Sequence, residues 1–133
     1  MKTSATLIII CSLFIDSCVE GIWSKTHVKL NNNLPAETLR VHCKSRDDDL
    51  GIHDITRSWG FSFIPHFLDG TLFSCNFAWP GQLHWFDIYE QSRDQEECTQ
   101  CIWKISPKGP CRFNGTTGEF DACFPWSPSS RLW

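Results

Sequence analysis

Hydrophobic and polar residues alternate along most of this chain in short runs. No stretch keeps a convincing helical period, although residues 91–100 have room for one helical turn. Segments rich in Gly, Pro, Asn or Asp separate the runs, and these residue types favour tight turns. The pattern predicts an all-β fold, a small antiparallel β-sandwich of about seven to eight strands. The predicted strands cover residues 27–31, 38–45, 59–66, 72–79, 83–90, 100–106 and 109–114.

Alternate side chains of a strand point to opposite sides of a sheet, so parity predicts which face is buried. Four of the apolar faces also carry a cysteine, where disulfides could cross-link the core. The strand at 83–90 is ambiguous because Asp87 shares a face with Trp85 and Tyr89. It is either buried on both sides or holds Asp87 hydrogen-bonded inside. The aligned residues elsewhere are Leu39, Val41 and Cys43; Trp59, Phe61 and Phe63; Phe73, Cys75, Phe77 and Trp79; Cys101, Trp103 and Ile105; and Cys111 with Phe113.

The N-terminal segment has the pattern of a secretory signal peptide. Lys2 precedes an apolar run of the length that a signal-peptide core needs, and this run is too short to span a membrane. Cleavage before Ile22 is the preferred interpretation, and cleavage after Ser17 is the alternative. We therefore expect residues 1–21 to be removed. Residues 22–133 then form one secreted, extracellular domain with a C-terminal tail from about residue 116.

Removal of residues 1–21 leaves six cysteines, and an even number in a short extracellular chain indicates three disulfides. Spacing alone does not choose among the possible pairings. Two of the six lie outside the predicted strands, one before a strand and one in the tail, so they are interpreted as a separate outer disulfide. Zinc at the Cys-x-x-Cys pair is disfavoured because the last two cysteines lack matching close spacing. No metal or other cofactor is expected. The strand cysteines are Cys43, Cys75, Cys101 and Cys111, and the outer ones are Cys98 and Cys123.

Five ordered motifs resemble those of the plant self-incompatibility S-protein homologue family. The match runs from about residue 27 to residue 113. The family's best-known members are secreted stigma proteins that act as ligands for a receptor on incompatible pollen. The motifs are Val41-His42-Cys43-Lys44-Ser45-Arg46-Asp47-Asp48-Asp49-Leu50-Gly51, Thr71-Leu72-Phe73-Ser74-Cys75, Phe86-Asp87-Ile88-Tyr89, Cys101-Ile102-Trp103 and Gly109-Pro110-Cys111.

The resemblance implies a disulfide-bonded β-sandwich without enzymatic activity. It also implies a role as an extracellular signalling ligand for a cell-surface receptor on a target plant cell, with pollen rejection as one such role. Family members commonly keep four cysteines, which match the strand cysteines here. Cys98, Cys123 and the tail from Thr116 to Trp133 depart from the family pattern.

Charge and histidine placement weigh against other classes of function. The chain has 12 basic and 15 acidic side chains, a formal net charge of −3, which argues against nucleic-acid binding and membrane insertion. Five histidines are scattered without a catalytic motif, so no catalytic residue is assigned. A secreted hydrolase such as a ribonuclease, which would pair His42 with His84, remains the alternative, together with a defence protein.

Recognition is expected in the loops at the ends of the sandwich, because loops can vary while the core holds them. The loops chosen are residues 46–54, 67–71, 80–82 and 91–97, and charged residues 93–97 are expected to be the most exposed. A calcium site at the acidic run is disfavoured because the EF-hand spacing is missing. A solvated turn with a structural role is preferred there, in which Gly51 permits positive φ and Asp side chains cap nearby backbone N–H groups. The candidate recognition residues are Asp47, Asp48, Asp49, Arg93, Asp94, Glu96 and Glu97.

Two further features fall outside the predicted strands. Asn114-Gly115-Thr116 is an N-glycosylation sequon, so Asn114 is expected to carry a glycan. Trp23, Trp126 and Trp133 are either exposed anchors for a partner or part of a tail that folds back over one end of the sandwich.

Overall fold

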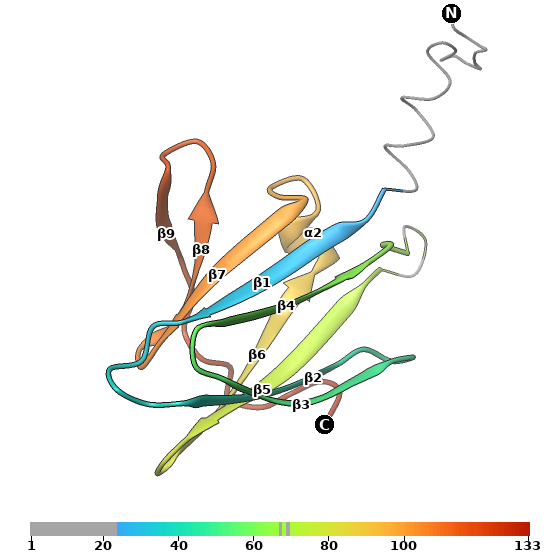
Figure 1. The fold of residues 1–133 in the computed structure, drawn as a ribbon. Helices are drawn as coiled ribbons and strands as arrows, with labels where there is room; N and C mark the ends of the chain where they lie inside the picture. Colours follow the sequence, from blue (N-terminus) through green and yellow to red (C-terminus); the bar gives the residue numbers. More distant parts are fainter. Residues whose placement is uncertain (1–23, 67, 69) are drawn as a thin grey trace, which may run out of the picture.

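Two twisted β-sheets face each other in the computed structural model, which describes residues 24–66, 68 and 70–133 (Figure 1). The five-stranded sheet has the order β4-β1-β7-β8-β9, and the four-stranded sheet has the order β3-β2-β5-β6. The first contains β1 (Thr26–Asn32), β4 (Ser58–Phe63), β7 (Gln100–Ser106), β8 (Gly109–Asn114) and β9 (Glu119–Cys123). The second contains β2 (Leu39–Lys44), β3 (Asp49–Ile55), β5 (Leu72–Trp79) and β6 (Gln82–Glu90), which leads into the short helix α2 (Gln91–Asp94).

The all-β prediction is confirmed, with two strands more than the seven runs identified from the pattern. β3 was missed because it begins in the acidic run and carries charged residues on its exposed side. β9 was missed because it lies in the segment interpreted as tail. Neighbouring strands are antiparallel except β1 and β7, which pair in parallel. The predicted signal peptide, residues 1–21, lies outside the described residues.

The core fills the space between the sheets as parity predicts for most strands. Leu39, Val41 and Cys43 of β2 are fully buried, and so are the three aligned residues of β7. Aromatic rings from the two sheets meet across this space: Phe61 and Phe63 of β4 contact the ring of Phe73 in β5. The sandwich therefore rests on interlocking aromatic and aliphatic side chains, which give large apolar burial for a short chain.

A bulge explains the ambiguous strand at 83–90. The register between β5 and β6 shifts at Phe73/Ser74, so Tyr89 turns into the core although Asp87 does not. Asp87 lies on the outer face and pairs with Arg131 of the tail. The strand is therefore packed on both faces, and a bulge of this kind changes the side that a residue faces.

The parity assigned to β8 is wrong. Its inward side chain is Arg112, which is 7% exposed, whereas Cys111 and Phe113 are half-buried on the outer face. Phe113 contacts Phe120 of β9 there. A charged residue can occupy the inner face because a buried carboxylate, Asp94, neutralises it.

All six described cysteines form disulfides, each of which joins residues on the same sheet or at its end. The pairs are Cys43–Cys75, Cys98–Cys101 and Cys111–Cys123. The expected outer pairing of Cys98 with Cys123 is wrong, because Cys123 lies on β9 directly opposite Cys111. The bridges thus clamp neighbouring strands and the turn before β7, and they do not join the two sheets.

The C-terminal tail folds back onto the sandwich. Trp126 packs against Phe77 and stacks on His84 with ring centroids 4.7 Å apart. Farther along, Ser127 forms a β-bridge with Trp85, and Trp133 contacts the ring of Trp85 while staying 42% exposed. Trp23 lies outside the described residues. No helix in the described part of the chain is long and apolar enough to cross a membrane.

Candidate functional site

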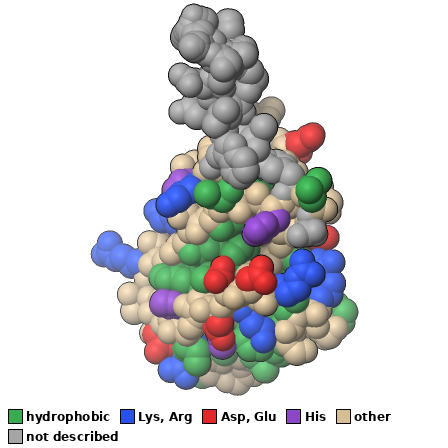
Figure 2. Space-filling model, turned by 90° about the vertical axis from the view of Figure 1, so that its right-hand side faces the viewer, with side chains coloured by type: hydrophobic (Ala, Val, Ile, Leu, Met, Phe, Trp, Pro, Cys, Tyr) green, Lys and Arg blue, Asp and Glu red, His purple; other side chains and the backbone are tan. Residues whose placement is uncertain are grey.

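A cleft of about 710 Å³ opens at one end of the sandwich, and parts of three of the four predicted recognition loops line it. These parts are Arg46 to Asp48, Gly70 with Thr71, and Gln91 with Ser92. Figure 2 looks at the right-hand side of Figure 1 and shows hydrophobic side chains in the middle of that face, with acidic and basic side chains beside them. The fourth loop, 80–82, does not reach this cleft. Phe67 and Asp69 lie outside the described residues.

The floor of the cleft is aromatic and its walls come from both sheets. Phe63 at the end of β4 and Phe73 at the start of β5 have ring centroids 4.7 Å apart. Leu132 of the tail adds an apolar wall, and Arg131 beside it is held by Asp87 and Glu90. These ion pairs raise the pKa of Arg131, so it keeps its charge. The cleft thus combines an apolar floor with a charged border, as ligand-binding clefts commonly do.

One wall of the cleft is a tight turn that presents two carboxylates. The Ser45 hydroxyl accepts hydrogen bonds from the backbone N–H groups of Asp47 and Asp48 at 3.3 and 3.0 Å. The Ser45 N–H donates to the Asp48 carbonyl at 2.8 Å, which closes the turn. Within the described residues, the carboxylates of Asp47 and Asp48 make no hydrogen bond or ion pair, so both are available to a partner.

Asp49, by contrast, has a structural role and does not line the cleft. Its Oδ1 accepts the Gly51 N–H at 2.9 Å and lies 2.6 Å from Nε2 of His42. Both interactions lower the pKa of Asp49. Gly51 has φ near 80°, which a residue with a side chain adopts only at a cost. Asp49 therefore fixes the start of β3, which is the structural role preferred from the sequence.

The loop after β4 is tied to α2 through Thr71. Its N–H donates to Oε1 of Gln91 at 2.8 Å, and its carbonyl accepts the Gln91 N–H at 3.0 Å. The Thr71 hydroxyl accepts the His66 N–H at 2.7 Å. These three hydrogen bonds hold the loop between β4 and β5, which forms another wall of the cleft, in place.

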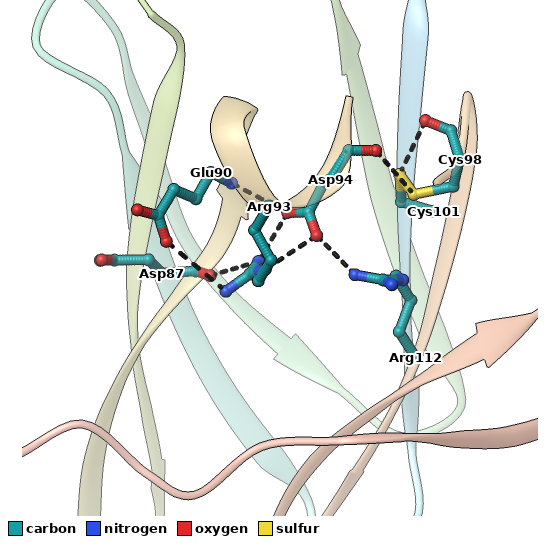
Figure 3. The surroundings of a disulfide bond; sticks show 7 residues. All are labelled: Asp87, Glu90, Arg93, Asp94, Cys98, Cys101 and Arg112. Carbon is teal, nitrogen blue, oxygen red and sulfur yellow. Dashed lines mark hydrogen bonds and ion pairs between the residues drawn. A yellow bond between two sulfur atoms is a disulfide. The ribbon is translucent and has the colours of Figure 1, made fainter. Parts of the chain in front are cut away.

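The charged segment 93–97 is not the exposed surface that its composition predicts. Asp94 is completely buried, and Figure 3 shows Arg93 and Arg112 converging on its carboxylate beside the Cys98–Cys101 disulfide. The Glu90 N–H also donates to this carboxylate, at 2.9 Å. Arg93 and Asp94 therefore anchor α2 against the core and are not available for recognition.

Glu96 and Glu97 are exposed, as predicted, but they do not line the cleft. The two histidines of the ribonuclease alternative have different neighbours. His42 faces Asp49 and the ring of Trp133, whereas His84 stacks on Trp126. Burial lowers the pKa of His84. In the described residues the structure does not bring them together around a shared partner.

Asn114 ends β8 at the tip of the β8–β9 hairpin. Its Oδ1 accepts the Thr116 N–H at 2.9 Å, and Gly115 and Thr116 are exposed. The sequon therefore lies in an accessible turn, and its residues do not line the cleft. Glycosylation of Asn114 stays a prediction.

A two-sheet fold with intrasheet disulfides and an open loop-lined end defines a class of small β-sandwich proteins that present loops on a rigid core. Residues 27–126 match the family described as plant self-incompatibility protein S1, and the chain belongs to this family. The resemblance identified from the five motifs is thus confirmed.

Several Arabidopsis thaliana proteins are similar to this chain. S-protein homolog 2 is 47% identical over 114 residues, which cover 80% of this chain and 71% of the relative. S-protein homolog 4 is 44% identical over 119 residues, 82% of this chain and 78% of the relative. S-protein homolog 29 is 36% identical over 135 residues and covers 96% of this chain and its own full length.

Proposed function

We propose that this S-protein-type chain is a secreted signalling ligand that a receptor on the surface of a plant cell recognises through the cleft end of the sandwich. The observation that carries the proposal is the convergence of three loops, distant in sequence, on one cleft. Each loop is held by its own hydrogen bonds, so the surface is preorganised. The loops therefore lose little conformational entropy when a partner binds.

The chemistry of the cleft suits protein recognition. Phe63 and Phe73 supply an apolar centre, and Asp47 and Asp48 supply negative charge that no described side chain neutralises. Buried apolar anchors give affinity, while charges at the border steer the approach of a partner and determine its register. A receptor segment with an apolar side chain flanked by basic residues fits this arrangement.

No observation on the described residues supports a catalytic role as the loop-lined cleft supports recognition. The histidines of the ribonuclease alternative have separate neighbours, and all six described cysteines are in disulfides. We therefore propose recognition without turnover.

The direct experiment is expression of the full chain in plant cells, followed by binding of the purified, labelled secreted protein to intact plant cells. The proposal predicts release into the medium with an N-terminus at Ile22 and saturable binding that unlabelled protein displaces. Retention in the cell, or binding that never saturates, would contradict it. Incubation with RNA, polysaccharide and anionic vesicles is the parallel control, and turnover or leakage would favour the alternatives instead.

A further inference from the structure

The four edge strands of the two sheets are protected to different degrees. An edge strand presents unpaired backbone groups to other chains, and proteins usually block it with charges, bulges, short length or a covering segment. β9 is only five residues long, carries Glu119 and Asp121, and is cross-linked to β8. β3 carries Asp49 and Asp54, and its register with β2 is interrupted.

The tail protects the edge strand β6. Ser127 pairs with Trp85 as an antiparallel bridge, and its N–H donates to the Trp85 carbonyl at 2.8 Å. The tail thus occupies the place that a neighbouring strand would take. Three of the four edges are therefore blocked within the described residues.

β4 carries neither a charge nor a bulge, and no described strand pairs with its outer edge. Its sequence, Ser-Trp-Gly-Phe-Ser-Phe, has no charged residue and no proline. It pairs with β1 over six consecutive residues from Ser58 to Phe63 without a register shift, so it is a regular strand. Figure 1 shows it as the outermost strand of its sheet. Among the described residues, β1 is the strand that pairs with it along its length.

The two faces of β4 differ sharply. Trp59, Phe61 and Phe63 form an aromatic row on the inner side, with neighbouring centroids 5.5 and 6.0 Å apart, and all three are only half-buried. Ser58, Gly60 and Ser62 lie on the outer side and are exposed. Gly60 allows the close approach of β1, since a Cβ there would lie 2.5 Å from the Val28 carbonyl oxygen. The aromatic row on the inner side still has apolar surface to bury.

We propose that β4 is a pairing edge for a second copy of this chain, with antiparallel β4–β4 pairing that extends the five-stranded sheet across a two-fold axis. The absence of charge on β4 favours this occupant. Two copies of a net negative chain meet here without like charges on the paired strands, and a charged partner strand would find no counter-charge.

The geometry restricts the register of such a pair. Residues directly opposite each other in antiparallel strands share a face, so aromatic residues must oppose aromatic residues. A two-fold axis at Phe61 places Trp59 opposite Phe63 of the second copy, and Gly60 opposite Ser62. Both inner rows then join into one apolar strip, and both outer faces stay small. Ser62 and Phe63 also line the cleft, so this dimer and a partner bound in the cleft exclude each other.

The test is sedimentation equilibrium of the oxidised mature chain over a concentration series, with variants that charge the edge. The proposal predicts a reversible monomer–dimer equilibrium in the wild type. Ser62→Lys should weaken dimerisation by about tenfold or more, because two lysines approach across the axis. Ser58→Lys lies three residues from the axis, so its two copies stand about 20 Å apart and should weaken dimerisation much less. Gln100→Lys adds the same charge on β7, an interior strand of the same sheet, and should leave dimerisation unchanged.

Amide hydrogen exchange on the wild type provides a readout that needs no variant. Protection of the β4 amides should rise with protein concentration, while protection of the β9 amides should not. A chain that stays monomeric up to millimolar concentration would overturn the proposal. So would a dimer that Ser62→Lys leaves intact, or concentration-independent exchange of β4. Thermal unfolding of each variant verifies that loss of dimer is not loss of fold.

Discussion

Asp94 and Arg112 form a buried ion pair beneath α2, with Oδ1 of Asp94 and Nη1 of Arg112 separated by 2.5 Å. Asp94 has no exposed surface, and Arg93 contacts the same carboxylate from the other side. The two guanidinium groups also lie near the ring of Trp103, 5.3 and 5.6 Å from its centre. One carboxylate thus binds both guanidinium groups where α2 meets the core.

Replacement of this carboxylate is expected to be strongly destabilising. Asp94→Asn leaves Arg112 without a counter-charge and Arg93 with only the 4.0 Å contact to Glu90, and breaking a buried pair on one side typically costs about 3–5 kcal/mol. Urea unfolding measures the change. Asp121→Asn on the exposed side of β9 is the matched control and should stay within about 0.5 kcal/mol of the wild type. A loss below about 1 kcal/mol for Asp94→Asn would show that the pair does not have this role.

The three disulfides should contribute unequally to stability. A bridge limits the unfolded chain more when it closes a longer loop. Cys43–Cys75 spans 32 residues and Cys98–Cys101 only 3. Replacing the first pair by alanines should therefore cost about 4 kcal/mol, and replacing the second about 2 kcal/mol. Chemical denaturation of the two double variants gives the order, and the reverse order would contradict this account.

Acidification should weaken the tail cluster around His84. Burial lowers the pKa of His84 below its ordinary value of 6.5, so the unfolded chain binds this proton more readily than the folded chain. The His84 contribution to stability is complete above pH 6.5 and is lost as the pH falls through the folded pKa. His84→Gln should reduce the drop in melting temperature between pH 7.5 and pH 5.5. An unchanged drop in melting temperature would mean that protonation of His84 does not cause it.

Asn114 should carry a glycan when the chain passes through the secretory pathway. The side chain ends a strand before an exposed turn, where the sequon is accessible. Mass spectrometry of the secreted protein before and after glycosidase treatment measures occupancy. Asn114→Gln should remove the added mass, and Thr116→Ala should do the same. A secreted wild type with the bare polypeptide mass would disprove the prediction.

The strand pattern was predictable because it depends on local alternation. The inner faces of β2 and β7 follow directly from residues such as Val41 and Trp103. The predictions that were wrong concern residues whose contacts are with residues distant in sequence. β9 exists because it pairs with β8, and the disulfide pairing follows from Cys123 lying opposite Cys111.

The segment from Arg93 to Glu97 shows the same limit. Its composition is that of a solvated loop, and the burial of Asp94 depends on Arg112, 18 residues away, as well as on the neighbouring Arg93. The cleft was partly predictable for a related reason. The positions of the loops were predicted from turn-forming residues. Their convergence on one end of the sandwich, however, depends on how the two sheets pack.

The most direct test of the account compares two charge reversals in the binding of labelled secreted protein to intact plant cells. Asp47→Lys/Asp48→Lys changes the cleft wall, and Glu96→Lys/Glu97→Lys changes an exposed surface outside it by the same amount. The account predicts that the first variant loses saturable binding while the second retains it, with both proteins folded. Equal binding by both variants, or loss only in the second, would contradict recognition through the cleft.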